Sequence, residues 1–228
     1  MAGDDVLVLT AVPAEAAAVL SHFDDGEPVE LGPYRGTAVK TGAGRVVVLS
    51  GGVGPARAAA CAATALCLSR PALLLVAGIG GGFAGRARVG DAVLADAIVH
   101  ADLGADSPGG FLPISELGFG ADRALPDRAL VRLAAARTGA VVGPILTVST
   151  VTGTDAGAAE LVARYDPAAE AMEGAGGWAA AEAYGVPILE LRAVSNPVGR
   201  RDRASWDLPA ALGTLGRATA DLLQEPLP

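Results

Sequence analysis

Short apolar runs typical of buried strands alternate along this chain with alanine-rich helical stretches, and this alternation constrains the fold more than any other feature. The run VLVLT (6–10) comes before one helical stretch, and the run LLLVA (73–77) follows another. Pro13 and Pro55 open the two helical stretches, because proline is favoured in the first turn of a helix. Strands that alternate with helices form layered α/β domains. The sequence therefore predicts a three-layer α/β/α fold with a central mixed sheet.

The same patterns predict the remaining elements. Strands are predicted at residues 6–10, 37–41, 45–50, 73–77, 89–99, 144–149 and 187–194. Helices are predicted at residues 13–23, 55–68, 127–138, 156–165, 174–184 and 208–223. Residues 103–122 hold many glycines and prolines without a period, which favours a long functional loop. No repeat or linker divides the sequence, so we expect one domain over residues 1–228.

Composition narrows the class of partner to a small molecule. The formal net charge of -8 and the pI near 4.7 oppose nucleic acid and anionic membranes as partners, since a phosphate backbone needs a basic surface. The apolar runs fall well short of the roughly 20 residues of a membrane helix, so we expect a cytoplasmic protein. Cys61, Cys67, His22 and His100 form no cluster in the sequence, so we expect no metal site.

Gly80, Gly82 and Gly85 follow an apolar run and form the pattern GxGxxG. In a dinucleotide-binding fold these glycines lead directly into a helix whose N-terminus holds the pyrophosphate. Here the run after Asp91 is typical of a strand, which disfavours an NAD-dependent oxidoreductase. Two interpretations stay open: a tight turn where backbones pack closely, or a surface of small residues on which a flat ligand lies.

Three polar side chains stand out because they follow predicted strands or lie in apolar surroundings. Glu15 follows the first strand by five residues, Glu173 lies in an otherwise apolar stretch, and Asn196 follows the last strand. Ligands of α/β sheets bind beyond the carboxyl ends of the strands, and a charge in apolar surroundings is costly without a partner. These residues are the candidate site. The alternatives are an exposed helix carboxylate for Glu15 and a buried, satisfied glutamate for Glu173.

Four segments, in sequence order, resemble the nucleoside phosphorylase and nucleosidase family, which cleaves N-glycosidic bonds of purine nucleosides. They are GGVGPARAAA (51–60), AGIGGGFAGRARVGDAVLADA (77–97), AEAMEGAG (169–176) and RAVSNPVG (192–199). The Met-Glu pair together with the VGD strand makes the likeness specific. The resemblance implies a nucleoside phosphorylase-like fold, a nucleoside substrate, chemistry without a metal or organic cofactor, and a homo-oligomer (dimer or higher).

The resemblance also implies roles for single residues. Glu15 matches the glutamate that polarises the attacking water in nucleosidases. Glu173 matches the glutamate that accepts hydrogen bonds from the ribose hydroxyls, and the transition state it would face resembles an oxocarbenium ion. Met172 is expected to pack on the ribose. The remaining expected substrate contacts are Gly80, Gly81 and Thr154.

The attacking group is water or phosphate, and a phosphate dianion needs cations or amide donors to hold it. Phosphorylases of this family carry an arginine in the turn after the first strand, and TAVPAEAA (10–17) has none. The resemblance therefore favours hydrolysis. Arg57 and Arg86 remain as residues that could hold an anion.

Asn196 stands where adenine-cleaving nucleosidases carry an aspartate that protonates N7. An amide delivers no proton, but its NH2 group donates hydrogen bonds to N7 and O6 of a 6-oxopurine as charge builds up on the base. An amide also pairs with the N6 and N7 edge of adenine, so chemistry alone leaves both bases open. Within the family, asparagine here goes with hypoxanthine or guanine.

The segment PVGRRDRASW (197–206) is similar to a branch of the family that hydrolyses a hypoxanthine riboside with a carboxyphenyl group at its 5′ end. Arg201 and Trp206 are the expected contacts to that group. A solvated charged turn and packing against the last helix are the alternatives. Cleavage of methylthioadenosine or adenosylhomocysteine, and nucleoside binding without catalysis, stay open as other functions.

Overall fold

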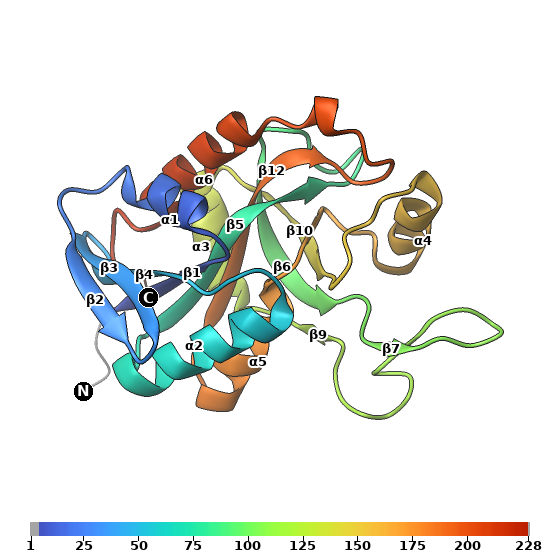
Figure 1. Cartoon of the computed structure of the whole chain (residues 1–228), viewed down its shortest axis with the longest axis horizontal. Coiled ribbons are helices and arrows are strands. Elements are labelled where there is room, and N and C mark those ends of the chain that lie inside the picture. The colour runs from blue at the N-terminus through green and yellow to red at the C-terminus, as the bar shows by residue number, and fades with distance from the viewer. Residues whose placement is uncertain (1–4, 228) are drawn as a thin grey trace.

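A mixed β-sheet forms the centre of the structure, a computed structural model that describes residues 5–227 (Figure 1). Its strands are β1 (Val6–Thr10), β2 (Glu27–Leu31), β3 (Tyr34–Thr41), β4 (Gly44–Ser50), β5 (Leu73–Gly82), β6 (Ala92–His100), β9 (Arg123–Ala124), β10 (Val141–Thr147), β11 (Ala169–Ala171) and β12 (Ile188–Pro197). They follow the order β11-β10-β6-β12-β5-β1-β4-β3-β2, and β9 pairs with β6.

The sheet combines parallel and antiparallel pairs. Parallel pairs join β1 to β4 and β5, β5 to β12, and β10 to β6 and β11. Antiparallel pairs join β12 to β6, β11 to β5, β2 to β3, and β3 to β4. The predicted mixed sheet is confirmed. Because β1, β5 and β12 run parallel, their carboxyl ends reach the same edge of the sheet.

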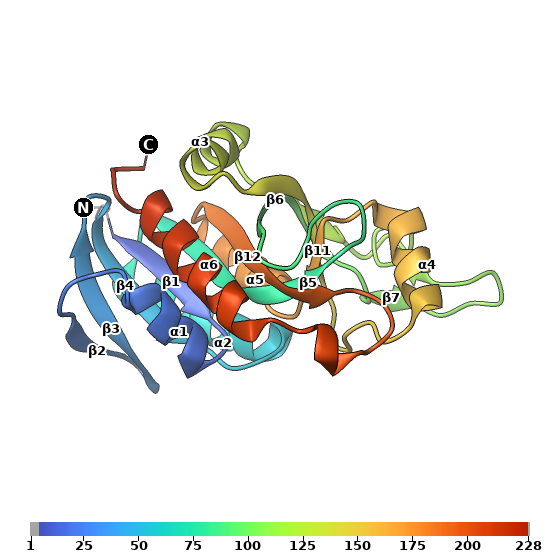
Figure 2. The same ribbon diagram turned by 90° about the horizontal axis from the view of Figure 1, so that it is seen from above.

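Helices cover both faces of the sheet, as the predicted three-layer fold requires. One face carries α2 (Pro55–Ser69) and α5 (Gly174–Tyr184), which pack against each other. The opposite face carries α1 (Pro13–Leu20), α3 (Arg128–Thr138) and α6 (Leu208–Leu222), and Figure 2 shows α1 beside α6. Within residues 5–227, none of the helices combines the length and apolar character needed to cross a membrane.

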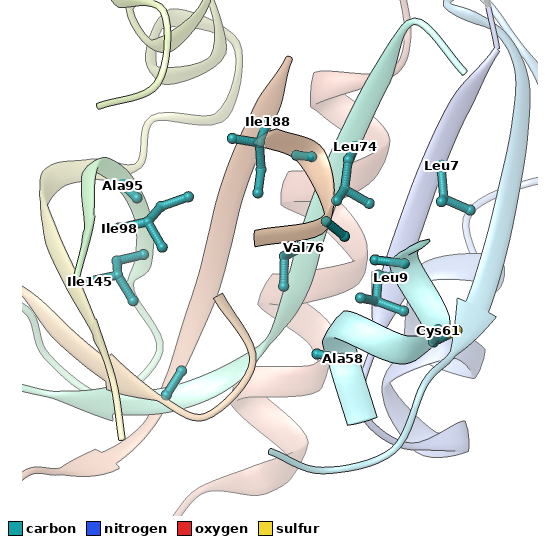
Figure 3. Close-up of a cluster of buried hydrophobic side chains, with 14 of the residues drawn as sticks. Leu7, Leu9, Ala58, Cys61, Leu74, Val76, Ala95, Ile98, Ile145 and Ile188 are labelled. Atoms are coloured by element: carbon teal, nitrogen blue, oxygen red, sulfur yellow. The ribbon is translucent and has the colours of Figure 1, made fainter. Parts of the chain in front are cut away.

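The core follows from the alternation of side chains along each strand. In β1, Leu7 and Leu9 point to the layer of α2, where Ala58 joins the same cluster (Figure 3). Val8 points to the opposite layer and packs in a cluster with Val19 of α1. Because both faces of β1 are covered, its sequence is an uninterrupted apolar run.

The packing of α5 against α2 explains Gly176 of α5. A Cβ atom on Gly176 would lie 2.1 Å from the Pro55 carbonyl oxygen, which is shorter than any van der Waals contact. Glycine lowers helix propensity by about 1 kcal/mol relative to alanine. The segment is helical nevertheless: Gly176 lets the two helices approach closely, and Gly174 and Gly177 leave room for Glu190 and Val76.

The glycine-rich segment extends a strand and does not open a helix. Gly80 and Gly82 lie in β5, and Gly85 has a φ of 79° in the turn before β6. The chain then enters β6 at Ala92, so the glycines lead into a strand, as predicted.

The structure departs from the predicted elements at weak sequence signals. The strands β2 and β11 were not predicted. Pro28 and alternating exposed side chains in β2 fit an edge strand, where proline is tolerated. β11 is only three residues of alanine and glutamate, which have low strand propensity. The predicted loop 103–122 contains a small hairpin of β7 (Gly104–Ala105) and β8 (Leu112–Pro113), near α4 (Asp155–Tyr165) in Figure 1.

Candidate active site

A cavity opens at the edge of the sheet where β1, β5 and β12 end. This is the position at which α/β sheets bind ligands, because parallel strands bring their carboxyl ends together. The residues predicted for the site that line the cavity are Glu15, Gly80, Gly81, Met172, Glu173, Asn196, Arg201 and Trp206. Segments that are far apart in the sequence therefore meet around one space.

Glu15 lies in the first turn of α1, with its carboxylate turned back toward the end of β1. One carboxylate oxygen accepts hydrogen bonds from the amides of Ala11 (2.9 Å) and Val12 (3.1 Å), and the other accepts from the amide of Ile79 (2.9 Å). Only 3% of the residue is exposed, so the exposed-carboxylate alternative is wrong. Burial raises the pKa of the Glu15 carboxyl, and the three amides and the nearby Arg192 charge oppose this rise. The result is a rigid, buried carboxylate at the cavity wall.

Glu173 precedes α5 and is held by two donors. Its Oε1 accepts a hydrogen bond from the amide of Gly54 (3.1 Å), and its Oε2 accepts one from Nη1 of Arg192 (2.9 Å). Arg192 comes from β12, and its side chain is 1% exposed. Charge-assisted hydrogen bonds of this kind fix the orientation of a carboxylate. Glu173 is therefore both buried and paired, and it also lines the cavity.

Arg192 bridges Glu173 to a second buried carboxylate, Glu190. The Arg192 Nε donates to Glu190 Oε1 at 2.9 Å. Burial raises the pKa of the Glu190 carboxyl to about 7, although the Arg192 charge opposes this rise. Within the described part of the chain, Glu190 Oε2 and Arg192 Nη2 have no hydrogen-bond partner. Neither residue was predicted as part of the site, because Arg192 stood out only as part of the segment RAVSNPVG (192–199).

Gly78 in β5 is the point where two charged side chains converge. A Cβ atom on this residue would lie 2.6 Å from Arg192 Nη1 and 2.7 Å from Glu15 Oε1. Only glycine leaves room for both groups, so β5 links the carboxylate of α1 to the charged cluster of β12.

Asn196 lies near the end of β12, after an irregularity in the pairing with β5. Its Oδ1 lies 2.8 Å from the hydroxyl of Ser195, which can donate to it. A Cβ atom on Gly81 would lie 3.3 Å from Asn196 Nδ2, so the amide nitrogen lies over this glycine. One NH2 hydrogen of Asn196 is donated to the Pro197 carbonyl oxygen (3.0 Å), which leaves the other for a ligand at the glycine floor of Gly80 and Gly81, beside the Val198 side chain. This geometry fits the interpretation in which a flat ligand lies on the glycines.

The rim of the cavity carries the aromatic and cationic residues predicted after β12. The guanidinium of Arg201 lies 5.2 Å from the centre of the Trp206 ring, and that of Arg203 lies 5.6 Å from it. Arg201 and Trp206 line the cavity. Cation–π contacts of this length are favourable, and they hold residues 201–203 against the Trp206 ring.

The cavity lining does not include Thr154, which was predicted as a substrate contact, or Arg57 and Arg86, which were candidates for holding an anion. The hydroxyl of Thr154 accepts a hydrogen bond from the amide of Gly157 (3.1 Å), so Thr154 caps the N-terminus of α4. The Thr154 side chain therefore stabilises the start of α4 and does not face the cavity. Arg86 pairs with Asp166, and Arg57 lies on α2; neither lines the cavity.

Comparison with known proteins identifies the class. The sequence matches the phosphorylase superfamily over residues 5–225, and the chain therefore belongs to that superfamily. It is 57% identical to the futalosine hydrolase of Streptomyces coelicolor over 181 residues, which are 77% of each chain. It is 47% identical to the futalosine hydrolase of Acidothermus cellulolyticus over 224 residues, 95% of this chain and 89% of the relative.

The fold also matches a solved nucleosidase. The 5′-methylthioadenosine/S-adenosylhomocysteine nucleosidase from Neisseria meningitidis, in complex with methylthio-immucillin-A, superimposes with a TM-score of 0.83 at 24% identity. The match covers 97% of this chain and 99% of that chain. The family resemblance and the nucleoside phosphorylase-like fold predicted from the sequence are thus confirmed.

Proposed function

We propose that this protein hydrolyses the N-glycosidic bond of futalosine, releasing hypoxanthine and dehypoxanthine futalosine, a step of menaquinone biosynthesis. One observation carries the proposal: Glu15, Glu173 and Asn196, far apart in the sequence, line a single cavity. The identity to two futalosine hydrolases over most of the chain supports the choice of substrate.

The proposed mechanism assigns one task to each of the three side chains. Breaking the bond between ribose C1′ and N9 leaves positive charge on the sugar and negative charge on the base. Glu15 accepts a proton from water as the water oxygen bonds to C1′, a role that its raised pKa suits. Glu173 accepts hydrogen bonds from the ribose hydroxyls. Asn196 donates to the departing base the NH2 hydrogen that Pro197 does not accept. The base takes up one proton, which balances the proton that the water gives to Glu15.

The lack of a free cation near the reaction centre favours hydrolysis over phosphorolysis. The turn from β1 to α1 contains no arginine, and the buried Arg192 already pairs with Glu173 and Glu190. Arg57 and Arg86 do not line the cavity. Without a free cation beside Glu15 in the described residues, a phosphate dianion lacks the partner it needs.

The 5′ end of the substrate is assigned to the rim of the cavity. Arg201 supplies a positive charge for a carboxylate, and the Trp206 ring supplies an apolar face for a phenyl group. Met172 packs against the ribose, between these residues and the glycine floor of Gly80 and Gly81.

A homo-oligomer is part of the proposal. Val53 and Val151 line the cavity, yet 50% and 41% of their surfaces are exposed. Apolar side chains at an open wall fit a cavity that a second copy of the chain completes. Light scattering coupled to gel filtration is expected to give a mass of at least two chains.

Chromatography of futalosine, methylthioadenosine and inosine after incubation with the protein tests the function. We expect hypoxanthine to be released from futalosine alone, at a rate that does not depend on phosphate. Glu15→Gln is expected to abolish turnover and to retain substrate binding, and Glu182→Gln on the exposed side of α5 is the matched control. Release of adenine from methylthioadenosine at a higher rate would favour the nucleosidase alternative. Binding of futalosine without turnover by the wild-type protein would favour a binding protein.

A further inference from the structure

A second buried carboxylate, Glu170, lines the cavity and has no task in the proposed mechanism. It lies in the short strand β11 and is 5% exposed. One of its oxygens accepts a hydrogen bond from the amide of Thr152 (2.8 Å), and the other accepts one from the Thr152 hydroxyl. A carboxylate has about four acceptor sites, so each oxygen retains acceptor capacity.

The sheet register puts Glu170 and Asn196 on opposite sides of the glycine floor. Gly81 of β5 pairs with Glu170 of β11 on one side and with Asn196 of β12 on the other. Residues directly opposite each other in neighbouring strands point to the same face of a sheet. Glu170 and Asn196 therefore face one cavity across Gly81, and all three residues line it.

Two side-chain atoms lie over Gly81: a Cβ atom on this residue would lie 2.7 Å from Val198 Cγ2 and 3.3 Å from Asn196 Nδ2. Two strand spacings separate the backbones of Glu170 and Asn196 by about 10 Å. Because the Asn196 amide leans over Gly81, a base that it binds is shifted from β12 toward β11, the strand of Glu170. With the Asn196 amide at N7 and O6, the N1 edge is directed to Glu170.

The N1 edge is where hypoxanthine and adenine have opposite hydrogen-bonding character. Hypoxanthine carries a hydrogen on N1 and is a donor there, whereas N1 of adenine is an acceptor. A carboxylate accepts hydrogen bonds only, so it favours the donor and repels the acceptor. Glu170 also engages both donors of Thr152, which removes them from the edge of the base.

We infer that Glu170 selects hypoxanthine over adenine by accepting a hydrogen bond from N1–H of the base. The inference rests on the proposed function, since it assigns the base-recognition step of the same site. Asn196 tolerates both bases, because an amide pairs with either. Glu170 supplies the discrimination that Asn196 lacks.

The variant Glu170→Gln tests the inference through base selectivity. The Thr152 amide can only donate, so the Gln oxygen stays on it and the Gln NH2 group takes the place beside the Thr152 hydroxyl. A donor then replaces an acceptor at the cavity. We expect kcat/KM for futalosine to fall by about 10- to 100-fold, while the value for the analogue with adenine in place of hypoxanthine does not fall.

The control is Glu160→Gln on the exposed side of α4, for which both values are expected to stay within about twofold of wild type. An equal loss with both substrates would mean that Glu170 only supports the loop of Thr152, and it would overturn the inference. Unchanged selectivity would overturn it as well.

A binding measurement on the wild-type protein covers the case in which Glu170→Gln does not fold. Calorimetry compares hypoxanthine with its 1-deaza analogue, in which C–H replaces N1–H. We expect the analogue to bind at least about tenfold more weakly. Equal affinities, or no binding of either base, would overturn the inference. Weaker binding of the analogue by a protein that does not hydrolyse futalosine would refute the proposed function and leave the inference standing.

Discussion

Replacing Gly78 by alanine adds one methyl group at the most crowded point of the site. The new Cβ would lie 2.6 Å from Arg192 Nη1 and 2.7 Å from Glu15 Oε1. Ordinary contact needs about 3.4 Å or more, so Arg192 must move by about 0.8 Å and Glu15 by about 0.7 Å. Neither moves freely, because three amides hold Glu15 and two carboxylates hold Arg192.

Both the activity and the stability of Gly78→Ala are therefore expected to fall. A displacement near 1 Å at a catalytic group costs up to about 100-fold in rate, so we expect kcat to fall by about 10- to 100-fold. Overpacking of a buried site costs about 1–3 kcal/mol of unfolding free energy. Futalosine turnover and urea unfolding measure the two effects.

The matched control is Gly109→Ala, because a Cβ at Gly109 meets only the Ser107 hydroxyl at 3.7 Å. This variant is expected to keep both the rate and the urea midpoint of the wild-type protein. A Gly78→Ala protein with wild-type kcat and an unchanged urea midpoint would contradict this prediction, since it would mean that Glu15 and Arg192 can move apart at no cost in free energy.

Three further predictions concern the charged cluster and the helices. Arg192→Leu leaves Glu173 and Glu190 without their shared cation and is expected to lower the unfolding free energy by about 3–5 kcal/mol in urea, whereas an unchanged urea midpoint would contradict the buried network. Because burial raises the pKa of Glu190 from 4.5 to about 7, its protonated form stabilises the fold below pH 4.5, and this contribution is lost as the pH rises to about 7. Relative to Glu190→Gln, the wild-type protein is therefore expected to lose about 3 kcal/mol of stability between these values; parallel pH profiles would show that the shift is absent. Gly176→Ala is expected to destabilise the protein, because its Cβ would clash with α2. Gly213→Ala on α6 is expected to raise the unfolding free energy by about 0.5–1 kcal/mol, because its Cβ meets only the flexible end of an arginine. Shifts of the melting temperature with the same sign in both variants would contradict this contrast.

Much of the fold was predictable because strand and helix patterns alternate clearly. The runs of β1 and β5 are apolar because both faces of the sheet are covered, and prolines mark the starts of α1 and α2. The short strand β11 was not predictable, because its pairing with β5 and β10 depends on tertiary contacts and not on strand propensity.

The candidate site was predictable where a residue is unusual in its own sequence context. Glu15, Glu173 and Asn196 stand out as polar residues at strand ends or in apolar runs, and all three line the cavity. Arg192 and Glu190 were missed because Glu173, the other partner of Arg192, lies far away in the sequence, and the pattern along β12 does not show that its two charged side chains are buried as a pair. The family resemblance predicted Thr154 as a substrate contact, but its hydroxyl caps α4.

A structure of the Glu15→Gln protein with intact futalosine tests the central claim most directly. We expect the Glu173 carboxylate within hydrogen-bond distance of both ribose hydroxyls, the Asn196 amide at the hypoxanthine ring, and residue 15 facing C1′ with a water between them. Futalosine bound with its ribose away from Glu173, or with its base away from Asn196, would contradict the account.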